Sequence, residues 1–363
     1  MCQQHQNYQP RQCIIPPYLS DKVFDKASKK NLPKVINNKL RSSRFRNDRN
    51  FFGSLNKQQR TAFIAGGKIT KKPQLKMQVF NMKQNTVLSN AQVIWNNGKE
   101  IIKPDKVTKN VINGCRATWN LYYEIYGRNS IDNLGMHIKQ YIHYDNKYEN
   151  AFWDGRRMIF GDGDGKTFGS FTLDADIIGH ELTHAVIQYE ANLEYHNQSG
   201  ALNESLSDVF GIMIKQRLLN LDVKKSNWLI GENIVKGNKY ALRNMKAPGK
   251  AFINHPDLGN DPQPATMNKY VQMPDTEEGD WGGVHYNSGI ANFAFYVAAF
   301  NIGGNSWEKT GRIWYAALTD KTLKATANFA DFKNLTIKKA TQLFGKGSLE
   351  TKAVAEGWAA AKV

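Results

Sequence analysis

The chain has 363 residues, of which 41% are hydrophobic and 22% charged, a composition typical of a soluble protein with one large or two ordinary domains. Its net charge of +17 would suit a nucleic-acid or membrane partner, but residues 1–60 hold 13 Lys/Arg against 3 Asp/Glu and carry most of the excess. Because no aromatic residues interleave with the basic ones and no apolar run could cross a bilayer, we expect neither partner.

The N-terminal segment, residues 1–50, has the character of a separate unit. Residues 1–12 are polar and lack the apolar region of a Sec signal peptide, so we expect secretion by another route, or a cytoplasmic protein until release. The stretch Cys13-Ile14-Ile15-Pro16-Pro17-Tyr18-Leu19 predicts extended backbone that proline stiffens. We expect a short helix over 19–30 that Ser20 caps, and an exposed basic linker over 37–50 that is open to proteolytic cleavage.

Residues 51–173 predict a β-rich subdomain. Alternating residues indicate strands over 74–80, 91–95 and 136–144, with a turn at 96–98. A helical period between them predicts a helix over 106–126, with Cys115 in its apolar stripe. The run Gly161-Asp162-Gly163-Asp164-Gly165 lacks the ligand spacing of an EF-hand, so we expect a tight turn that joins two strands. With only three cysteines, the fold is not expected to depend on disulfides.

Residues 174–363 predict a mainly helical subdomain. Helices are expected over 173–190, 200–219, 287–300, 306–318, 329–344 and 348–361. The stretch 221–285 contains five prolines and is expected to be irregular, shaping the rim of a cleft. The fold class is therefore α+β with two subdomains.

The chemistry begins at Gly179-His180-Glu181-Leu182-Thr183-His184. Two histidines four residues apart lie on one face of a helix, so both imidazoles can reach one metal ion. Glu181 lies between them, where it can contact a metal-bound water. The H-E-x-x-H spacing is typical of zinc hydrolases, although a chance match on a buried helix would look the same.

A zinc site with catalytic function needs a third protein ligand. Glu204 follows His180 by 24 positions, and Asp208 lies one turn further along an otherwise apolar helix. Two acids at this spacing are costly to bury unless a cation compensates them. We therefore expect Glu204 to bind the metal and Asp208 to orient a histidine ring, the alternative being two solvated surface acids.

These motifs, in this order, resemble the thermolysin family of zinc metallopeptidases. The resemblance spans roughly residues 60–363 and includes a later block, Asp280-Trp281-Gly282-Gly283-Val284-His285-Tyr286-Asn287-Ser288-Gly289. It implies a two-subdomain fold with the zinc-binding helix at the base of the cleft. The segment with Pro16-Pro17-Tyr18 is similar to the short propeptide of the protealysin-like subgroup.

The resemblance implies a role for each matching site residue. Glu181 would be the general base that activates the zinc-bound water and later protonates the leaving amine. His285, oriented by Asp280, and Tyr195 would stabilise the oxyanion. Arg243 would bind a substrate carbonyl, and Asn150 with the Ala151 backbone would hold the substrate main chain. Without the resemblance, a lone histidine, tyrosine or arginine would be an ordinary structural or surface residue.

The resemblance also implies a substrate preference. Five apolar residues match the S1′ pocket, namely Phe168, Phe171, Ile177, Ile234 and Leu242. We therefore expect a neutral endopeptidase, a monomer, that cleaves on the amino side of bulky hydrophobic residues. Phe171 is expected to tighten the pocket.

One metal site of the family is altered in this chain. Calcium-stabilised relatives place acids at positions that match Asp176, Lys215, Asn227, Leu229 and Glu232. Only Asp176 and Glu232 are acidic here, which argues against a double calcium site. We expect Lys215 to replace the cation by pairing with one of the two acids.

The N-terminal segment is expected to keep the site covered in a zymogen and to be removed autocatalytically near residues 45–60. Cys13 could bind the zinc through its thiolate, or it could be a plain thiol. Alternatively Ile14 and Ile15 could fill the S1′ pocket while Pro16-Pro17-Tyr18 anchors the segment. Two other functions stay open at this point: a zinc-binding protein without turnover, and an effector protease with a narrow target.

Overall fold

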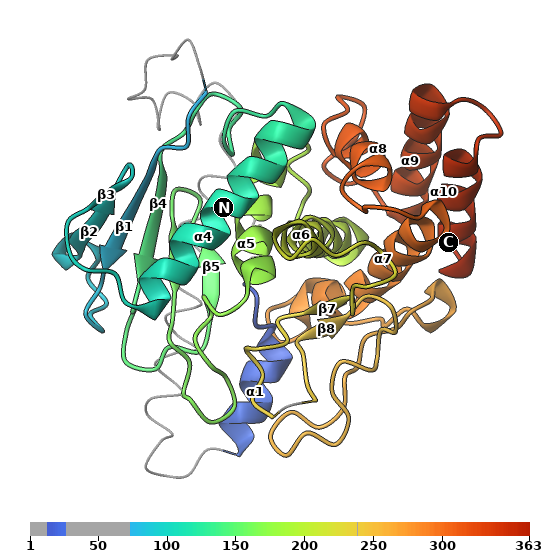
Figure 1. Ribbon diagram of the computed structural model, residues 1–363. Helices are drawn as coiled ribbons and strands as arrows, with labels where there is room; N and C mark the ends of the chain where they lie inside the picture. Colours follow the sequence, from blue (N-terminus) through green and yellow to red (C-terminus); the bar gives the residue numbers. More distant parts are fainter. Residues whose placement is uncertain (1–12, 27–72, 238) are drawn as a thin grey trace, which may run out of the picture.

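The computed structural model describes residues 13–26, 73–237 and 239–363. A six-stranded sheet and helix α4 (Lys106–Asn120) form one side of the molecule, and helices α6 to α10, within residues 197–360, form the other (Figure 1). Helix α5 (Ala175–Tyr189) lies between them. All residues from Asp176 to Tyr189 are buried, as expected for a helix with neighbours on every side.

The sheet has the order β3-β2-β1-β4-β6-β5. β1 pairs in parallel with β4, β4 pairs in parallel with β6, and the other pairs are antiparallel. The strands are β1 (Met77–Asn81), β2 (Gln92–Asn96), β3 (Lys99–Glu100), β4 (Ile138–Ile142), β5 (Ala151–Trp153) and β6 (Met158–Phe160). β5 lies at the sheet edge that faces α5, so its residues border the helix that carries His180, Glu181 and His184.

Helices dominate the second half. They are α6 (Asn197–Leu218), α7 (Asp280–Ile302), α8 (Lys309–Leu318), α9 (Phe329–Phe344) and α10 (Leu349–Ala360). A small pair, β7 (Leu229–Ile230) and β8 (Arg243–Asn244), interrupts the irregular region, with short 3-10 turns at Leu88–Asn90 and Met267–Lys269 elsewhere. Among the described residues, no helix is long and apolar enough to span a bilayer.

Several sequence expectations need correction. The first helix, α1 (Pro17–Asp25), begins two residues before the expected start, because proline at the first helical position has its backbone angle already set; Ser20 lies inside the helix and does not cap it. The expected end of this helix at residue 30 and the linker over 37–50 lie outside the described residues. Helix α4 (Lys106–Asn120) continues as a π-helical turn over Leu121–Ile125.

The Gly/Asp run is also not the expected turn between two strands. It follows β6, and the chain after it meets Val235 only through an isolated bridge at Phe168. The Asp164 carboxylate accepts hydrogen bonds from the backbone N–H groups of residues 166, 167 and 168. This local bonding bends the chain and offers the backbone an alternative to a strand ladder.

His143 joins three elements beside this run. Its Nδ1 donates to Asp162 at 2.8 Å, and its Nε2 donates to Asp105, the N-cap of α4, at 2.9 Å. Both ring nitrogens face carboxylates, which favours the imidazolium form. Burial lowers the pKa of His143, but the hydrogen bonds and charges of Asp162 and Asp105 outweigh it and raise the pKa above 6.5.

We therefore predict that His143 stabilises the fold at low pH. A raised pKa in the folded state gives a contribution that is complete below the unfolded value of 6.5 and is lost as pH rises through the folded value. The pairs are partly exposed, so His143→Gln should cost about 1 kcal/mol of unfolding free energy at pH 5.5 and little at pH 9. Denaturant unfolding measures this free energy at both pH values, for proteins with and without His143→Gln that both also carry Glu181→Gln. Equal losses of unfolding free energy at pH 5.5 and pH 9 would contradict the prediction.

Candidate active site

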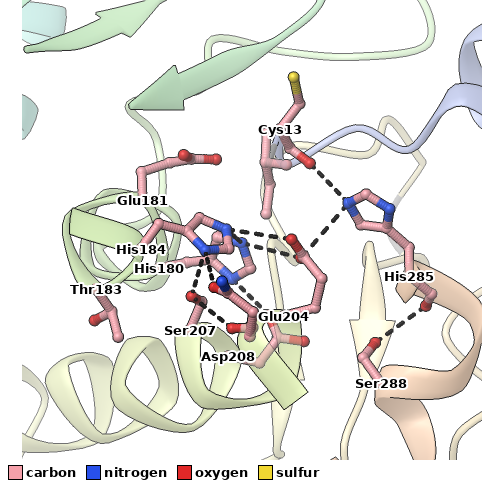
Figure 2. A network of polar contacts seen from close by, with 12 residues as sticks. Cys13, His180, Glu181, Thr183, His184, Glu204, Ser207, Asp208, His285 and Ser288 are labelled. Carbon is pink, nitrogen blue, oxygen red and sulfur yellow. Dashed lines mark hydrogen bonds and ion pairs between the residues drawn. The ribbon is translucent and has the colours of Figure 1, made fainter. Parts of the chain in front are cut away.

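Three buried ligand atoms from α5 and α6 converge on one point (Figure 2). His180 Nε2 and His184 Nε2 lie 2.9 Å apart. Glu204 Oε2 lies 3.4 Å from His180 Nε2, and Glu204 Oε1 lies 3.3 Å from His184 Nε2. Zinc bonds of about 2.0–2.2 Å in tetrahedral geometry separate their ligands by similar distances.

The hydrogen bonds of Nδ1 in each histidine explain why these three side chains together suit a cation. His180 Nδ1 lies 2.8 Å from Asp208 Oδ1, and His184 Nδ1 lies 2.9 Å from Asn203 Oδ1. These oxygens accept, so both Nδ1 atoms carry the proton and both Nε2 lone pairs face Glu204. Two lone pairs and a carboxylate, all fully buried, are stable together only around a positive charge. The residues therefore fit the zinc ion that the resemblance implies.

The Asp208 carboxylate connects His180 with Arg243. Besides His180, the carboxylate accepts hydrogen bonds from Arg243 Nε and Nη2, both at 2.7 Å, and from Asn292 Nδ2 at 2.8 Å. Burial raises the pKa of Asp208, but the Arg243 guanidinium and the His180 bond outweigh it and lower the pKa to about 2. Asp208 is thus ionised and holds the His180 ring in one tautomer.

Glu181 projects from the same helix turn as the two histidines. Its Oε2 accepts the backbone N–H of Trp153 on β5 at 3.1 Å. The Trp153 indole N–H in turn donates to Gln188 Oε1 at 3.2 Å, two turns further along α5. The sheet edge therefore fixes the carboxylate of Glu181 beside the metal ligands.

His285 comes from α7 and is oriented by Asp280. His285 Nδ1 donates to Asp280 Oδ1 at 2.6 Å, while Asp280 Oδ2 accepts the His285 backbone N–H at 2.8 Å. The turn that brings them together has positive φ at Asp280, Trp281, Gly282 and Gly283, before regular helix begins. Left-handed backbone is unfavourable for non-glycine residues, so the surrounding structure must hold Asp280 there.

Tyr195 lies between His285 and the metal ligands. Its hydroxyl donates to Glu204 and lies 3.2 Å from His285 Nε2. His285 Nε2 also donates to the backbone carbonyl of Cys13 at 2.9 Å, so both ring nitrogens act as donors. Burial lowers the pKa of His285, but the charges of Asp280 and Glu204 raise it overall, which fits the doubly donating ring.

Residues 13–15 lie across the site, with bends at Ile14 and Ile15 where the sequence predicted extended backbone. The Ile14 N–H donates to the Ala151 carbonyl at 3.3 Å, and the Ile15 N–H donates to Asn150 Oδ1 at 3.2 Å. The Ile14 carbonyl accepts from Arg243 Nη1 at 3.4 Å. Every residue that the resemblance assigned to the substrate main chain thus contacts this segment.

Of the two alternatives for Cys13, a zinc-binding thiolate and a plain thiol, the geometry favours the plain thiol. The thiol points away from the three ligands (Figure 2) and belongs to a buried cluster with residues of the sheet side, including Tyr148 and Phe152. It is the carbonyl oxygen of Cys13 that faces the site. Ile14 and Ile15 are both buried, at 0% and 1% exposure, in the large core that also contains the five residues that the resemblance assigned to S1′, Phe168, Phe171, Ile177, Ile234 and Leu242.

Two hydrogen-bond partners of His184 were not predicted from the sequence. Asn203 and Ser207 both reach its Nδ1, Ser207 Oγ at 2.8 Å. They flank Glu204 on α6 at a spacing of four, so they share one face of the helix. The spacing of four along this helix could have indicated them, as it indicated Glu204 and Asp208.

The position of the family's calcium pair holds a lysine. Lys215 Nζ lies 3.1 Å from Asp176 Oδ2, 2.5 Å from Glu232 Oε1 and 3.0 Å from the Leu229 carbonyl. Asn227 Nδ2 donates to Glu232 Oε2 at 2.6 Å. Burial raises the pKa of Asp176 to about 7, although Lys215 opposes the shift. An ammonium group already occupies the oxygen set, so these residues do not fit a calcium pair.

We predict that Lys215→Met destabilises the protein by about 3 kcal/mol, because it leaves Asp176 buried without its cation. The matched control is Lys225→Met, since Lys225 is exposed and lies 3.9 Å from Asp222. Calcium should change the melting temperature of the protein without the substitution very little. Calorimetry with calcium or with a chelator measures both effects. A large calcium-dependent rise that survives Lys215→Met would show that the lysine does not replace the ion.

Comparison with known proteins agrees with this geometry. Residues 30–188 match the model for the catalytic domain of thermolysin metallopeptidases, and residues 191–363 match the model for their alpha-helical domain. An extracellular metalloprotease of Pectobacterium carotovorum subsp. carotovorum is 50% identical over 230 residues, which are 63% of this chain and 65% of that protein. Protease PrtS of Photorhabdus sp. (strain Az29) is 45% identical over 256 residues, 70% of this chain and 68% of that protein. This chain thus matches about two thirds of the length of these relatives.

One solved structure extends the match to the N-terminal segment. The precursor of protealysin, a metalloproteinase from Serratia proteamaculans, aligns with a TM-score of 0.83 at 36% identity, covering 97% of this chain and 99% of that one. The expected α+β fold with two subdomains is confirmed by the family models and by this structure. The chain belongs to the thermolysin family of zinc metalloendopeptidases.

Proposed function

We propose that the protein is a zinc-dependent endopeptidase that cleaves on the amino side of bulky hydrophobic residues and is made as a zymogen. One observation carries this proposal. Residues 13–15 contact the site through the same groups that a substrate main chain would use, with the Cys13 carbonyl on His285 and the Ile14 carbonyl on Arg243. In this register the bond between Cys13 and Ile14 takes the place of the bond to be cut.

The register supports the proposed specificity. Ile14 then supplies the side chain that follows the cut bond, and it is fully buried in the same core as the S1′ residues. Leu242 and Ile177 pack tightly on Gly231, because a Cβ there would lie 2.8 Å from Leu242 Cδ1 and 3.3 Å from Ile177 Cδ1. An apolar, enclosed pocket favours large aliphatic and aromatic side chains over polar ones.

The chain's own residues supply the proton and charge chemistry. A zinc ion held by His180, His184 and Glu204 would polarise the carbonyl and lower the pKa of a water molecule. Glu181 takes a proton from the attacking water and gives it to the departing amine. His285 and Tyr195 donate hydrogen bonds where negative charge develops on the carbonyl oxygen.

Latency follows from the same contacts. While residues 13–15 occupy the site, no other chain can reach Arg243, Asn150 or Ala151 in this way. We expect autocatalytic removal near residues 45–60, a stretch outside the described residues, and the boundary at residue 50 stays a prediction. The Pectobacterium relative is named extracellular, which supports secretion of this protein. The monomeric state is also a prediction.

Digestion of casein by the processed protein tests this function. We expect hydrolysis that stops with a zinc chelator and returns with added zinc, and mass spectrometry should find new N-termini at Leu, Ile, Phe or Val. Cuts beside charged residues would contradict the pocket assignment. No hydrolysis after removal of the N-terminal segment would favour a zinc-binding protein without turnover.

A further inference from the structure

Helix α1 lies below β7 and β8 in Figure 1, and its contacts are with the irregular region and the start of α7. Lys22 Nζ donates to the Leu258 carbonyl at 2.7 Å, and Lys26 Nζ donates to the Pro256 carbonyl. The Tyr18 ring lies against Tyr286, with ring centroids 4.3 Å apart. The helix therefore touches a surface that the zinc ligands do not form.

The turn that accepts the lysines is held by its own bonds. His255 and Gly259 exchange two backbone hydrogen bonds at 2.8 and 2.9 Å. His255 Nδ1 accepts the backbone N–H groups of Asp257 and Leu258, both at 3.1 Å. The N–H groups are thus used inside the turn, while the carbonyls of Pro256 and Leu258 face α1. Within the part of the chain that the structure describes, Lys22 of α1 and Lys26, which follows it, are the donors to these two carbonyls.

The chemistry of this surface selects its occupant. Backbone carbonyls accept hydrogen bonds only, so they favour lysine over acidic or apolar side chains. The Asp261 carboxylate adds negative charge beside Lys22 and is held by the backbone N–H groups of Gly249, Ala251 and Gln263. Tyr286 offers an aromatic ring of which part is exposed, and a second ring stacks well on it.

The register across the site extends to this surface. If the bond between Cys13 and Ile14 marks the position of cleavage, Tyr18 is the fifth residue after the bond and Lys22 is the ninth. Lys22 lies in α1, and Lys26 directly follows its last residue, Asp25, so the four-residue spacing places both on the same side of this segment. Pro16 and Pro17, both buried, lead from residues 13–15 into the helix.

We propose that this surface, formed by the carbonyls of Pro256 and Leu258 with Asp261 and Tyr286, is an exosite for protein substrates once α1 has left. It takes the helical segment that follows the cut bond, with an aromatic residue at the fifth position and lysine at the ninth and thirteenth. The proposal rests on the proposed function. It assigns the enzyme a preference for basic, aromatic segments that lies well beyond the S1′ pocket.

Two long quenched fluorescent peptides and one short peptide test it on the processed enzyme. All share the residues around the cut bond. The first long peptide carries Tyr at the fifth position and Lys at the ninth and thirteenth, and the second carries Ala and Gln there. We expect kcat/KM about fivefold higher for the first long peptide, mainly through KM, and a gap that narrows in high salt.

Variants of Tyr286 supply the control. The ratio between the two long peptides should fall toward one in Tyr286→Ala and persist in Tyr286→Phe, and the short peptide normalises any change in basal activity. Equal kcat/KM for both long peptides in the starting enzyme would overturn the exosite while leaving the endopeptidase intact. Failure to cut even the short peptide would instead defeat the proposed function.

Discussion

Glu181→Gln is expected to lower kcat by about 10³-fold or more, because the amide can neither take the proton from water nor pass it to the leaving amine. The change should leave the structure intact, since a glutamine oxygen can still accept the Trp153 N–H that orients Glu181. Hydrolysis of the short fluorescent peptide measures the loss in rate, once an added protease has removed the N-terminal segment from the variant and from the unsubstituted protein alike. If the N-terminal segment is removed autocatalytically, this variant should also remain full length after purification.

Zinc content is the control for this variant. Glu181 is not part of the ligand group of His180, His184 and Glu204, so Glu181→Gln should bind one zinc per chain like the starting protein. Glu204→Gln should bind zinc more weakly and lose activity for that different reason. Spontaneous processing of Glu181→Gln would show that an outside protease removes the segment, and near-normal kcat would rule out Glu181 as the base.

Asp208→Asn should have the largest effect on stability among the site variants. It leaves the Arg243 guanidinium buried without a counter-charge and weakens the support of His180. Breaking a buried pair of this kind typically costs about 3–5 kcal/mol. Loss of a residue that orients a metal-binding histidine typically weakens metal binding by about 10–100-fold. Denaturant unfolding and zinc titration measure the two effects separately.

The matched control is Glu308→Gln, which removes an exposed acid and should change both quantities little. Arg243→Met offers a second comparison. Because Arg243 and Asp208 share two hydrogen bonds, the double variant should lose less stability than the sum of the single losses. Additive losses would mean that the pair is not coupled, and unchanged zinc affinity in Asp208→Asn would remove its orienting role.

The coupling through Asp208 has a functional meaning. One carboxylate holds both the ring of a metal ligand and the arginine that meets the chain in the cleft. In the proposed mechanism, a substrate main chain bound to Arg243 would therefore be linked to His180 through the Asp208 carboxylate alone. In the zymogen, the Ile14 carbonyl accepts a hydrogen bond from Arg243, so the covered site already has the arrangement that a substrate needs.

Local spacing explains what could be predicted from the sequence. His180 and His184 are four residues apart, and helical geometry alone brings them to one side of α5. The same spacing marked Glu204 and Asp208 on α6, where two acids on an apolar helix required a cation. Strands could be predicted from their alternating residues and the later helices from their helical period, for the same reason. The ends of these elements in the structure differ from the predicted ends by several residues. The roles of Tyr195, Arg243 and Asn150 came only through the family resemblance, because none has a local pattern.

Other features were decided by tertiary structure alone. Cys13 and His285 are 272 positions apart, and Ile14 and Arg243 are 229 apart, so no local spacing could relate them. The sequence left open whether the thiol or the segment beside it covers the zinc; the fold turns the thiol into the sheet-side cluster and the carbonyl toward His285. It also brings the turn at Pro256 and Leu258 beneath α1. The sequence by itself therefore determined the metal-binding side chains, because helices repeat over a few residues. The path of the N-terminal segment across them depended on contacts that exist only when distant parts of the chain pack together.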